Sequence, residues 1–488
     1  MITINYDDSG CGDGKTHRAM RSMTEVGGRH LYVVERVDTM TERARELQSI
    51  ATELGRFITT DSIRANADHR LAGRSVTARV ETIPDDYRTH QNIVVFITHE
   101  AMKLANFESF AGEGWSIWID EVPDILDQGK HRFCETWPKL EEMYQLHPTA
   151  KGNWSRATVI DGAPDIRALA QDDGLEMLRP FHRRLSDPRR DVFVNITKWD
   201  ELAVRGKELS WYSLWCPNDL QHFEGIFLLG NRLKSSATVA ILQAKWPEIE
   251  WRQMRSSPRR FAWRNVKITY FAESHCASRA LFSSERGQDN LRKIAEYIDF
   301  RVPPGEHIWS CNERYRSELD GLGGRWLSPR QSGSNRHSRV TNATMIFTAK
   351  PEPSVRAIYE RLGIDPDLFT VSAEREIILQ FICRTALRLP DDMRDVRLWV
   401  YDRAQAEYLR DYFADDPRGY VKCELRLENL GFAYQQRDSK PGRRKVALTP
   451  EQAEAKKVAD RIKDRDRKRR ERAEKVPAAN DDADRQAA

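Results

Sequence analysis

A glycine-rich segment near the start of the chain, Ser-Gly-Cys-Gly-Asp-Gly-Lys-Thr at residues 9–16, restricts the fold more than any other feature. It follows a short segment in which Ile2 and Ile4 alternate with polar residues, and it precedes a stretch of helical character. Glycines between a strand and a helix let backbone N–H groups converge on an anion, which is the setting of a phosphate-binding loop. The pattern therefore predicts a parallel α/β sheet at the start of the chain.

The residue types of this loop suit the binding of ATP. Lys15 would reach the β and γ phosphates, and the Thr16 hydroxyl would ligate Mg²⁺. The pattern departs from the full motif at its first position, where Ser9 replaces a glycine. The plain alternative is a flexible loop before a surface helix, but the strand–helix context favours phosphate binding. The predicted nucleotide-binding residues are Gly10, Gly12, Asp13, Gly14, Lys15 and Thr16.

A second signal lies at residues 115–121, where an apolar segment ends in two adjacent acids. Asp120 would hold Mg²⁺, directly or through water, and Glu121 would position or activate the attacking water. Acids at the end of a buried strand are common by themselves. Their occurrence in one chain with Lys15 makes the hydrolysis of ATP the favoured interpretation.

Apolar runs alternate with helical patterns along most of the chain, which predicts two α/β units in tandem. The expected strands are 31–37, 92–98, 115–120, 225–231, 266–272, 307–311, 343–349 and 396–402, and the expected helices are 40–54, 287–299, 353–362, 373–388 and 403–413. Residues 125–225 are rich in Trp, His and charge without clear periodicity, so they are interpreted as an insertion or a helical elaboration of the first unit. The predicted domains are 1–245, 246–436 and 437–488.

Charge is distributed unevenly over the chain, whose formal net charge is +4. Residues 437–488 contain 17 Lys/Arg and 11 Asp/Glu, so this tail carries about +6 and the rest about −2. A negatively charged partner is therefore suggested only for the tail. The segment 246–264 interleaves three tryptophans with arginines, which suits either a single nucleic-acid strand or a linker packed through its tryptophans.

Cysteine usage and hydropathy limit the classes of protein. The seven cysteines are scattered without a CxxC pair, which argues against a disulfide scaffold or zinc ribbon and favours a reducing cytoplasm. No apolar run approaches the ~18 residues that a membrane span needs. The first residues lack the basic and apolar regions of a secretory signal. We therefore expect a cytoplasmic protein that does not enter a membrane.

Two motifs resemble those of superfamily 2 (DEAD/DEAH-like) helicases. Asp-Glu-Val-Pro at 120–123 is similar to their Walker B box. Gln-Phe-Ile-Cys-Arg-Thr-Ala-Leu-Arg at 380–388 is similar to their motif VI, Gln-x-x-Gly-Arg-x-x-Arg, although Cys383 replaces the glycine and Arg388 lies one residue late. The resemblance implies that Gln380, Arg384 and Arg388 serve the γ-phosphate, and it leaves open which arginine contacts it. The alternative is a solvated basic helix face, but the segment is strongly apolar.

Weaker matches follow in the order expected of this family. Phe96–His99 resembles a nucleic-acid-contacting motif, which implies that Thr98 and His99 touch nucleic acid; a strand end with a capping Thr is the equal alternative. Ser236–Thr238 matches the Ser-Ala-Thr coupling motif of this family. The alternative is that these residues cap a helix. Ser332–Asn335 resembles motif V, which implies nucleotide binding by Gly333 and nucleic-acid binding by Asn335; a plain polar loop is the alternative.

The resemblance implies two RecA-like domains, with an insertion in the first and a basic C-terminal tail, that use ATP and Mg²⁺. The favoured function is an ATP-dependent helicase or translocase on nucleic acid, DNA rather than RNA, similar to phage or prophage replication helicases. One alternative is an ATPase that packages or remodels DNA without separating strands. Another is a nucleotide-gated adaptor in a replication or defence complex, and the tail could recruit replication or recombination proteins in either case.

Overall fold

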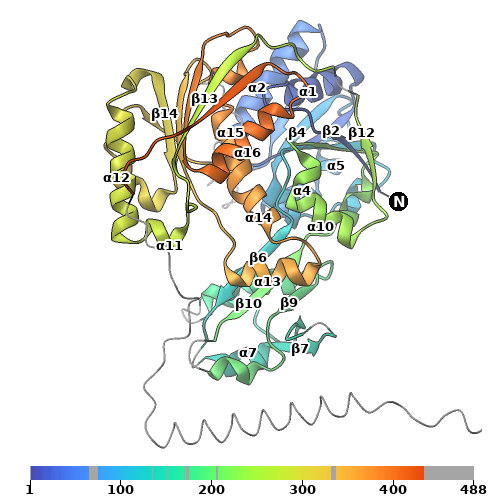
Figure 1. Ribbon diagram of the computed structural model, residues 1–488. Helices are drawn as coiled ribbons and strands as arrows, with labels where there is room; N and C mark the ends of the chain where they lie inside the picture. Colours follow the sequence, from blue (N-terminus) through green and yellow to red (C-terminus); the bar gives the residue numbers. More distant parts are fainter. Residues whose placement is uncertain are drawn as a thin grey trace, which may run out of the picture. The chain divides into compact units, whose positions relative to one another are not determined.

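The structure, a computed structural model, contains two parallel sheets and one antiparallel sheet (Figure 1). It describes residues 2–64, 75–133, 136–150, 152–169, 171, 175–204, 207–255, 257–330 and 337–432. The predicted basic tail, 437–488, lies outside the described residues. Within these ranges no helix is both long enough and apolar enough to cross a membrane.

The first sheet has seven parallel strands in the order β12-β1-β11-β5-β2-β4-β3. They are β1 (Thr3–Asp7), β2 (Arg29–Val34), β3 (Thr59–Ser62), β4 (Ile93–Thr98), β5 (Trp115–Asp120), β11 (Gly225–Leu229) and β12 (Glu250–Gln253). Successive residues of a strand point to opposite faces. In β2, Leu31 and Val33 belong to one buried cluster, whereas Tyr32 and Val34 belong to another. Both faces are therefore covered, which explains why the inner strands β2, β4 and β5 are mainly apolar along their length.

Helices cover both faces of this sheet. One face carries α1 (Lys15–Val26) and α2 (Val37–Glu53), which supply Met20, Met23 and Leu47 to the same cluster as Tyr32. The other face carries apolar side chains of α4 (Val76–Glu81), α5 (Ile83–Asp86), α6 (His99–Leu104) and α10 (Ala237–Lys245). Short 3₁₀ turns, η1 (Glu108–Phe110) and η5 (Leu233–Ser235), complete the connections.

The segment between β5 and β11 folds around an antiparallel sheet rather than around helices. Its order is β6-β10-β9-β8-β7. The elements are β6 (Leu126–His131), α7 (Trp137–Met143), β7 (Tyr144–Pro148), β8 (Ser155–Val159), α8 (Ile166–Leu169), η2 (Glu176–Leu178), α9 (Arg179–Leu185), β9 (Val192–Val194), η3 (Trp199–Ala203), β10 (Leu209–Leu214) and η4 (Pro217–His222). In β6 only Leu126 is buried, so the strand lacks the apolar run that sequence analysis needs. This region has its own core, which includes Phe181 and Trp211.

The second parallel sheet has six strands in the order β15-β14-β16-β17-β13-β18. They are β13 (Arg264–Ala272), β14 (His307–Cys311), β15 (Arg325–Trp326), β16 (Asn342–Ile346), β17 (Val396–Asp402) and β18 (Val421–Leu427). Val400 and Tyr401 of β17 again belong to different buried clusters, so both faces are covered. Two parallel sheets of this kind confirm the predicted fold class, two RecA-like α/β units in tandem.

The helices of the second unit include one long surface helix, α12, and a broken series that leads from α13 to η9. They are α11 (Arg279–Phe282), α12 (Glu285–Asp299), η6 (Pro304–Glu306), η7 (Glu313–Leu319), α13 (Pro353–Leu362), α14 (Asp367–Thr370), the π-helix η8 (Val371–Arg375), α15 (Glu376–Ile382), η9 (Ala386–Arg388) and α16 (Arg403–Ala414). The helix predicted over 373–388 thus ends at Ile382. Thr385 interrupts it, because its hydroxyl donates to the Ile382 carbonyl oxygen at 2.8 Å.

Helix α13 lies between β16 and β17 in sequence but packs on the first unit and its insertion, as Figure 1 shows beside β6 and β10. Tyr359 and Leu362 join the core cluster of the first sheet. Arg361 Nε donates to the Tyr212 hydroxyl at 2.7 Å, and its guanidinium lies 4.7 Å from the Phe193 ring centroid. The second unit is therefore tied to the insertion as well as to the first sheet.

The segment predicted as a linker contributes a strand to the first sheet. Residues of β12 pair in parallel with β1, with Trp251 opposite Ile4. Trp251 also packs edge-on against Tyr6, with ring centroids 6.2 Å apart. The sequence left open whether this segment binds a nucleic-acid strand or packs through its tryptophans. Trp251 packs against the first sheet, so its role is structural.

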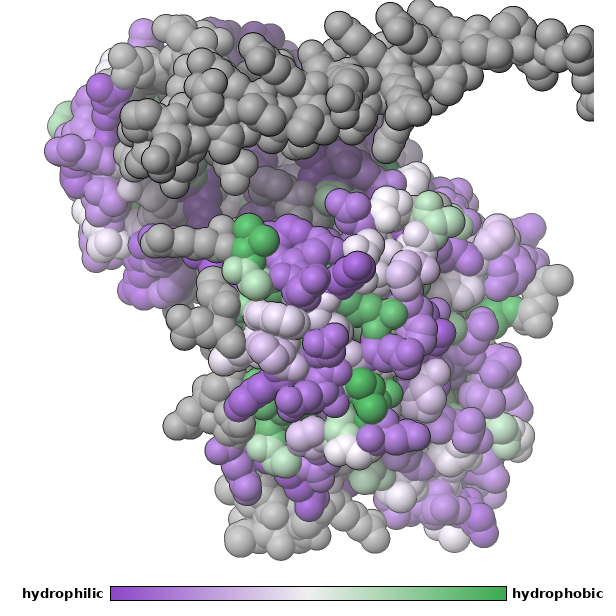
Figure 2. Space-filling view, turned by 90° about the horizontal axis from the view of Figure 1, so that it is seen from below, coloured by the Kyte–Doolittle hydropathy of each residue, from purple (hydrophilic) through white to green (hydrophobic). Residues whose placement is uncertain are grey.

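The surface of the described residues is mainly polar on the face shown in Figure 2, where hydrophobic groups occur in small separate patches. Large exposed apolar side chains are scattered over distant parts of the chain, such as Phe57, Met177 and Phe300. A wide apolar docking surface is not seen on that face.

Candidate functional site

The glycine-rich loop joins β1 to α1, as the sequence predicts. Gly12 and Gly14 have φ angles of 78° and 83°, a region that favours glycine. Gly14 directly precedes the first turn of α1, whose backbone N–H groups and dipole favour an anion. The local sequence thus produces the turn that a phosphate-binding loop requires.

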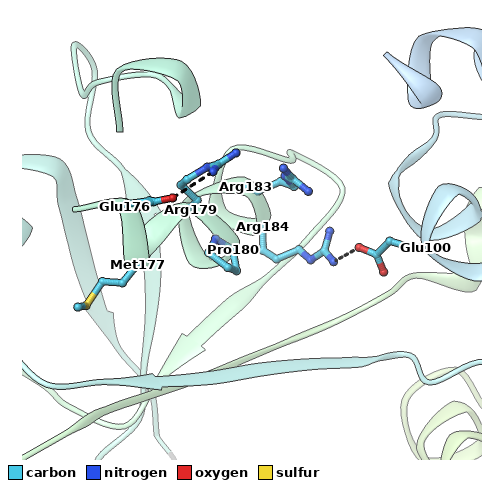
Figure 3. Close-up of a pocket in the computed structure, with 7 residues that line it drawn as sticks. All are labelled: Glu100, Glu176, Met177, Arg179, Pro180, Arg183 and Arg184. Carbon is cyan, nitrogen blue, oxygen red and sulfur yellow. Dashed lines mark hydrogen bonds and ion pairs between the residues drawn. The ribbon is translucent and has the colours of Figure 1, made fainter. Parts of the chain in front are cut away.

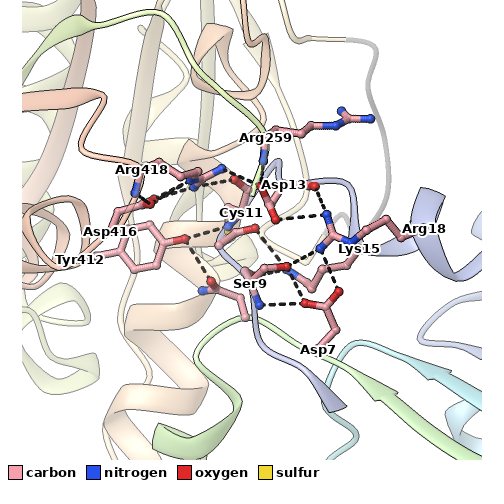
Figure 4. Close-up of polar contacts among 12 residues, drawn as sticks. Asp7, Ser9, Cys11, Asp13, Lys15, Arg18, Arg259, Tyr412, Asp416 and Arg418 are labelled. Carbon is pink, nitrogen blue, oxygen red and sulfur yellow. Dashed lines mark hydrogen bonds and ion pairs between the residues drawn. The ribbon is translucent and has the colours of Figure 1, made fainter. Parts of the chain in front are cut away.

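A buried ion-pair network holds the loop (Figure 4). Arg18 donates to Asp7 Oδ2 at 2.8 Å and to Asp13 Oδ2 at 3.1 Å. It also donates to the Ser9 hydroxyl at 2.6 Å, and that hydroxyl donates to Asp7 Oδ1 at 2.5 Å. Ser9, the departure from the motif, is therefore one of the groups that fix the loop. The Asp13 carboxylate is 1% exposed, so Asp13 supports the loop with its side chain and offers only its backbone to a ligand.

Lys15 and Thr16 lie at the start of α1. Lys15 Nζ donates to the carbonyl oxygens of Ser9 and Gly10, at 2.6 and 3.3 Å. The ammonium thus lies across the mouth of the loop. Thr16 Oγ1 is 3.2 Å from Asp120 Oδ1, so the hydroxyl and the carboxylate at the end of β5 are neighbours. These oxygens are hard donors, and Mg²⁺ is bound by one or two such groups together with water and phosphate oxygens. The donor set therefore fits Mg²⁺.

The two acids differ in surroundings. Arg43 of α2 lies with Nε 3.5 Å from Asp120 Oδ2, so Asp120 has a cationic neighbour. Glu121 has a φ of 68°, which is uncommon for a residue with a side chain. Burial, and next the charge of Asp120, raises the pKa of Glu121 above its ordinary value. Gln380 Nε2 lies 3.4 Å from Glu121 Oε2, so the second unit contacts this acid.

Arg384 and Arg388 reach the same cavity from the second unit, although the segment is not one continuous helix. A cavity of about 350 Å³ is lined by Lys15, Thr16, Asp120, Glu121, Gln380, Arg384 and Arg388, among others. Arg384 is 5% exposed, and among the described residues its Nε and Nη1 have no hydrogen-bond partner. Burial, and next the charge of Arg388, lowers the pKa of Arg384 to about 10. A buried guanidinium without an acidic partner indicates a site built for an anionic ligand.

Residues that line this cavity or hold its loop in place include some without a recognisable sequence signal. Arg259, from the segment predicted as a linker, donates its backbone N–H to Asp13 Oδ1 at 2.8 Å, and its side chain lies over Gly14. The Tyr412 hydroxyl accepts from the Cys11 N–H at 2.8 Å and donates to Asn231 Oδ1 at 3.0 Å. These contacts depend on distant segments meeting, so no local pattern predicts them.

The weaker motif matches have structural partners. The Thr98 hydroxyl accepts from the Ala101 N–H at 3.1 Å and caps α6, while His99 Nε2 lies 3.0 Å from the Asp120 carbonyl oxygen. Their assignment to nucleic acid stays a prediction. Ser236 caps α10, and Thr238 donates to the Pro123 carbonyl oxygen at 2.7 Å, so this triplet does touch the segment after the two acids. Gly333 and Asn335 lie outside the described residues.

A second hollow lies between α9 of the insertion and α6 (Figure 3). Its volume is about 640 Å³. Arg184 donates to Glu100 at 3.1 Å, and Arg179 pairs with Glu176 at 3.6 Å. Two of the arginines that line this hollow are therefore paired with acids, and the pair of Arg184 with Glu100 joins the insertion to α6.

Comparisons with known proteins concern the fold. No family model and no curated protein matches the sequence. A solved structure named XPD_APO is 12% identical over 87% of this chain and 97% of its own, with a TM-score of 0.50. A structure named XPD_Helicase is 12% identical over 87% of this chain and 96% of its own, with a TM-score of 0.48. The chain therefore shares the fold of the structure named XPD_APO.

The geometry makes Glu121 the group to test as a general base. Glu121→Gln keeps the hydrogen bond from Gln380 but removes the charge that accepts a proton. We expect ATP binding to persist and hydrolysis to fall by about 10² or more, measured as nucleotide affinity and steady-state phosphate release. Glu141→Gln, on the exposed face of α7, is the matched control and should behave as wild type. Loss of binding in a folded Glu121→Gln protein would instead make Glu121 a ligand.

Proposed function

We propose that the chain is an ATP-dependent nucleic-acid motor, a helicase or translocase of the superfamily 2 type. The observation that carries the proposal is the cavity between the two units, where Lys15 and the buried Arg384 face one space. A phosphate loop from one sheet and a buried arginine from the other, two of whose nitrogens have no hydrogen-bond partner among the described residues, are the parts that phosphoryl transfer uses. The helicase fold supports the same conclusion.

The roles follow from the positions. Backbone N–H groups of residues 10–16 and the Lys15 ammonium bind the phosphates of ATP. Thr16 and Asp120 would hold Mg²⁺, which supplies positive charge to the phosphate oxygens when bound. Glu121 accepts a proton from the attacking water, and Gln380 orients Glu121. Arg384, supported by Arg388, stabilises the negative charge that develops on the transferred phosphoryl group.

Hydrolysis would depend on how the two units meet, because the phosphates are bound by one unit and the arginines belong to the other. A change in their separation would start or stop turnover, and binding of a nucleic-acid strand across both units would favour one arrangement. The preference for DNA over RNA, the cytoplasmic location, the phage replication role and a nucleic-acid or protein contact of residues 437–488 stay predictions of the sequence.

The test is ATP hydrolysis by the full chain with and without single-stranded DNA or RNA. The proposal predicts Mg²⁺-dependent turnover that a single strand stimulates. Turnover without any response to nucleic acid would contradict the motor, and the complete absence of turnover with intact ATP binding would favour the nucleotide-gated adaptor.

A further inference from the structure

Two cysteines from the two units meet at the edge of the nucleotide cavity. Cys11 is the third residue of the phosphate loop, and Cys383 follows α15 and directly precedes Arg384. The neighbouring thiol is the main influence on the pKa of each, lowering that of Cys11 and raising that of Cys383. Cys11 also packs against the core cluster that contains Cys383, and both residues line the cavity. The residue that replaces the motif VI glycine is thus in contact with the loop that binds phosphate.

The backbone of Cys11 is held in place, as Figure 4 shows. The Cys11 N–H donates to the Tyr412 hydroxyl at 2.8 Å, and its carbonyl oxygen accepts from Arg418 Nη2 at 3.2 Å. The Cys383 N–H donates to the Leu379 carbonyl oxygen at 2.9 Å. Because both backbones are anchored and both cysteines line the same cavity, the two side chains are held near each other across the two units.

The two thiols are not equivalent. Cys11 is partly exposed towards the cavity, whereas Cys383 is 6% exposed. The hydrogen bond from the Cys383 thiol, together with the charge of Lys15, lowers the pKa of Cys11, and the same hydrogen bond raises the pKa of Cys383. The thiolate is the nucleophilic form of cysteine. Cys11 is therefore the sulfur that a small oxidant in the cavity would meet first.

We propose that Cys11 and Cys383 form a site of reversible oxidation by hydrogen peroxide, which links the phosphate loop to the arginine-bearing segment through a disulfide. The Cys11 thiolate attacks one peroxide oxygen and displaces hydroxide, which leaves a sulfenic acid. The Cys383 sulfur then attacks Cys11 Sγ, the S–S bond forms, and water leaves with the thiol proton. In sum, two thiols and one peroxide give one disulfide and two waters.

The bridge would stop the motor, and this consequence rests on the proposed function. A covalent bond between the loop and the residue before Arg384 fixes the distance between the two units, and this distance must change during turnover. Nucleotide entry would also be hindered, because the bridge lies in the wall of the cavity. Reduction of the disulfide by a thiol would restore both the separation and the turnover.

The bridge can be detected directly, because trypsin places each cysteine in a peptide without another cysteine, residues 1–15 and 376–384. The reduced full chain is treated with hydrogen peroxide, digested without reductant and analysed by mass spectrometry. We expect one joined species whose mass is the sum of the two peptide masses less two hydrogen atoms. Dithiothreitol should separate it into the two peptides again. Peroxide treatment that leaves these peptides unjoined would overturn the proposal, whether or not the protein hydrolyses ATP.

Turnover measured on the same samples tests the consequence. In wild type and in Cys276→Ser, which removes an exposed cysteine elsewhere, the fraction of turnover lost should equal the fraction of peptide joined, and dithiothreitol should restore it. Cys383→Ser can form the sulfenic acid of Cys11 but not the bridge, so it should keep a larger fraction of its own untreated rate after peroxide than wild type does. Full turnover in joined wild-type protein, or equal and reversible loss in Cys383→Ser, would contradict the lock. A wild type without turnover before treatment refutes the proposed function, while the peptide result still decides the bridge.

Discussion

Lys15→Ala will remove ATP hydrolysis almost completely while the chain stays folded. The ammonium lies on the carbonyl oxygens of Ser9 and Gly10, at the point where the phosphates of ATP would replace those contacts. Alanine offers no charge to the phosphoryl group as it is transferred. Removing one group that stabilises the charge developing in the transition state lowers the rate by about 10² to 10³. Because Lys15 would place a cation on the transferred group, we expect a loss at or above the upper end of that range.

The fold should tolerate Lys15→Ala, because Arg18, Asp7 and Asp13 still hold the loop when the contacts of Lys15 are lost. Phosphate release and the thermal unfolding midpoint are measured for the variant and for Lys293→Ala, a partly exposed lysine of α12. Lys293→Ala should match wild type in both. Wild-type turnover in Lys15→Ala would refute the phosphate-loop assignment, and a lowered midpoint would make the loss of turnover structural.

Arg384→Lys will lower nucleic-acid-stimulated turnover by about 10³ to 10⁵, the range for an arginine that reaches the transferred phosphoryl group. ATP affinity should change by only a few-fold, since the contact matters most in the transition state. Lysine is no substitute, because its ammonium lacks the planar fork of donors that guanidinium offers. Arg384 is the stronger choice over Arg388, since two of its buried nitrogens have no hydrogen-bond partner among the described residues.

Arg388→Lys is made in parallel to decide which arginine contacts the γ-phosphate, and we expect the smaller loss there. Arg403→Lys is the matched control, because Arg403 pairs with Glu273 and Glu407 on the surface of α16. Nucleotide affinity and stimulated phosphate release are measured for all three. Normal hydrolysis in both Arg384→Lys and Arg388→Lys would mean that the second unit does not complete the site, and the adaptor would become the better explanation.

The parts of this molecule that sequence analysis predicts are those whose signal is local. Glycines between a strand and a helix predict the turn at Gly12 and Gly14, and the apolar run of β5 predicts the strand that presents Asp120. Buried parallel strands are apolar on both faces, so their sequences are continuous and easily recognised. The fold class follows from such runs.

The parts that sequence analysis misses depend on contacts between distant segments. In β6 only one residue is buried, so its sequence shows no apolar run and the insertion appears irregular. Arg259 reaches the cavity, and Tyr412 reaches the loop beside it, only through the packing of distant segments. The contact of Cys11 with Cys383 is of the same kind, because neither residue alone indicates the other.

The central claim is that one nucleotide site is built from both units, and amide hydrogen exchange tests it most directly. Exchange of the full chain is compared with and without Mg²⁺, ADP and aluminium fluoride, a combination that mimics the transferred phosphoryl group, in the presence of single-stranded DNA. Slower exchange reports that backbone N–H groups have become less accessible or more stable. We predict slower exchange both in residues 9–16 and in residues 380–388, with α12 unchanged. Slower exchange in residues 9–16 alone would contradict the two-unit site.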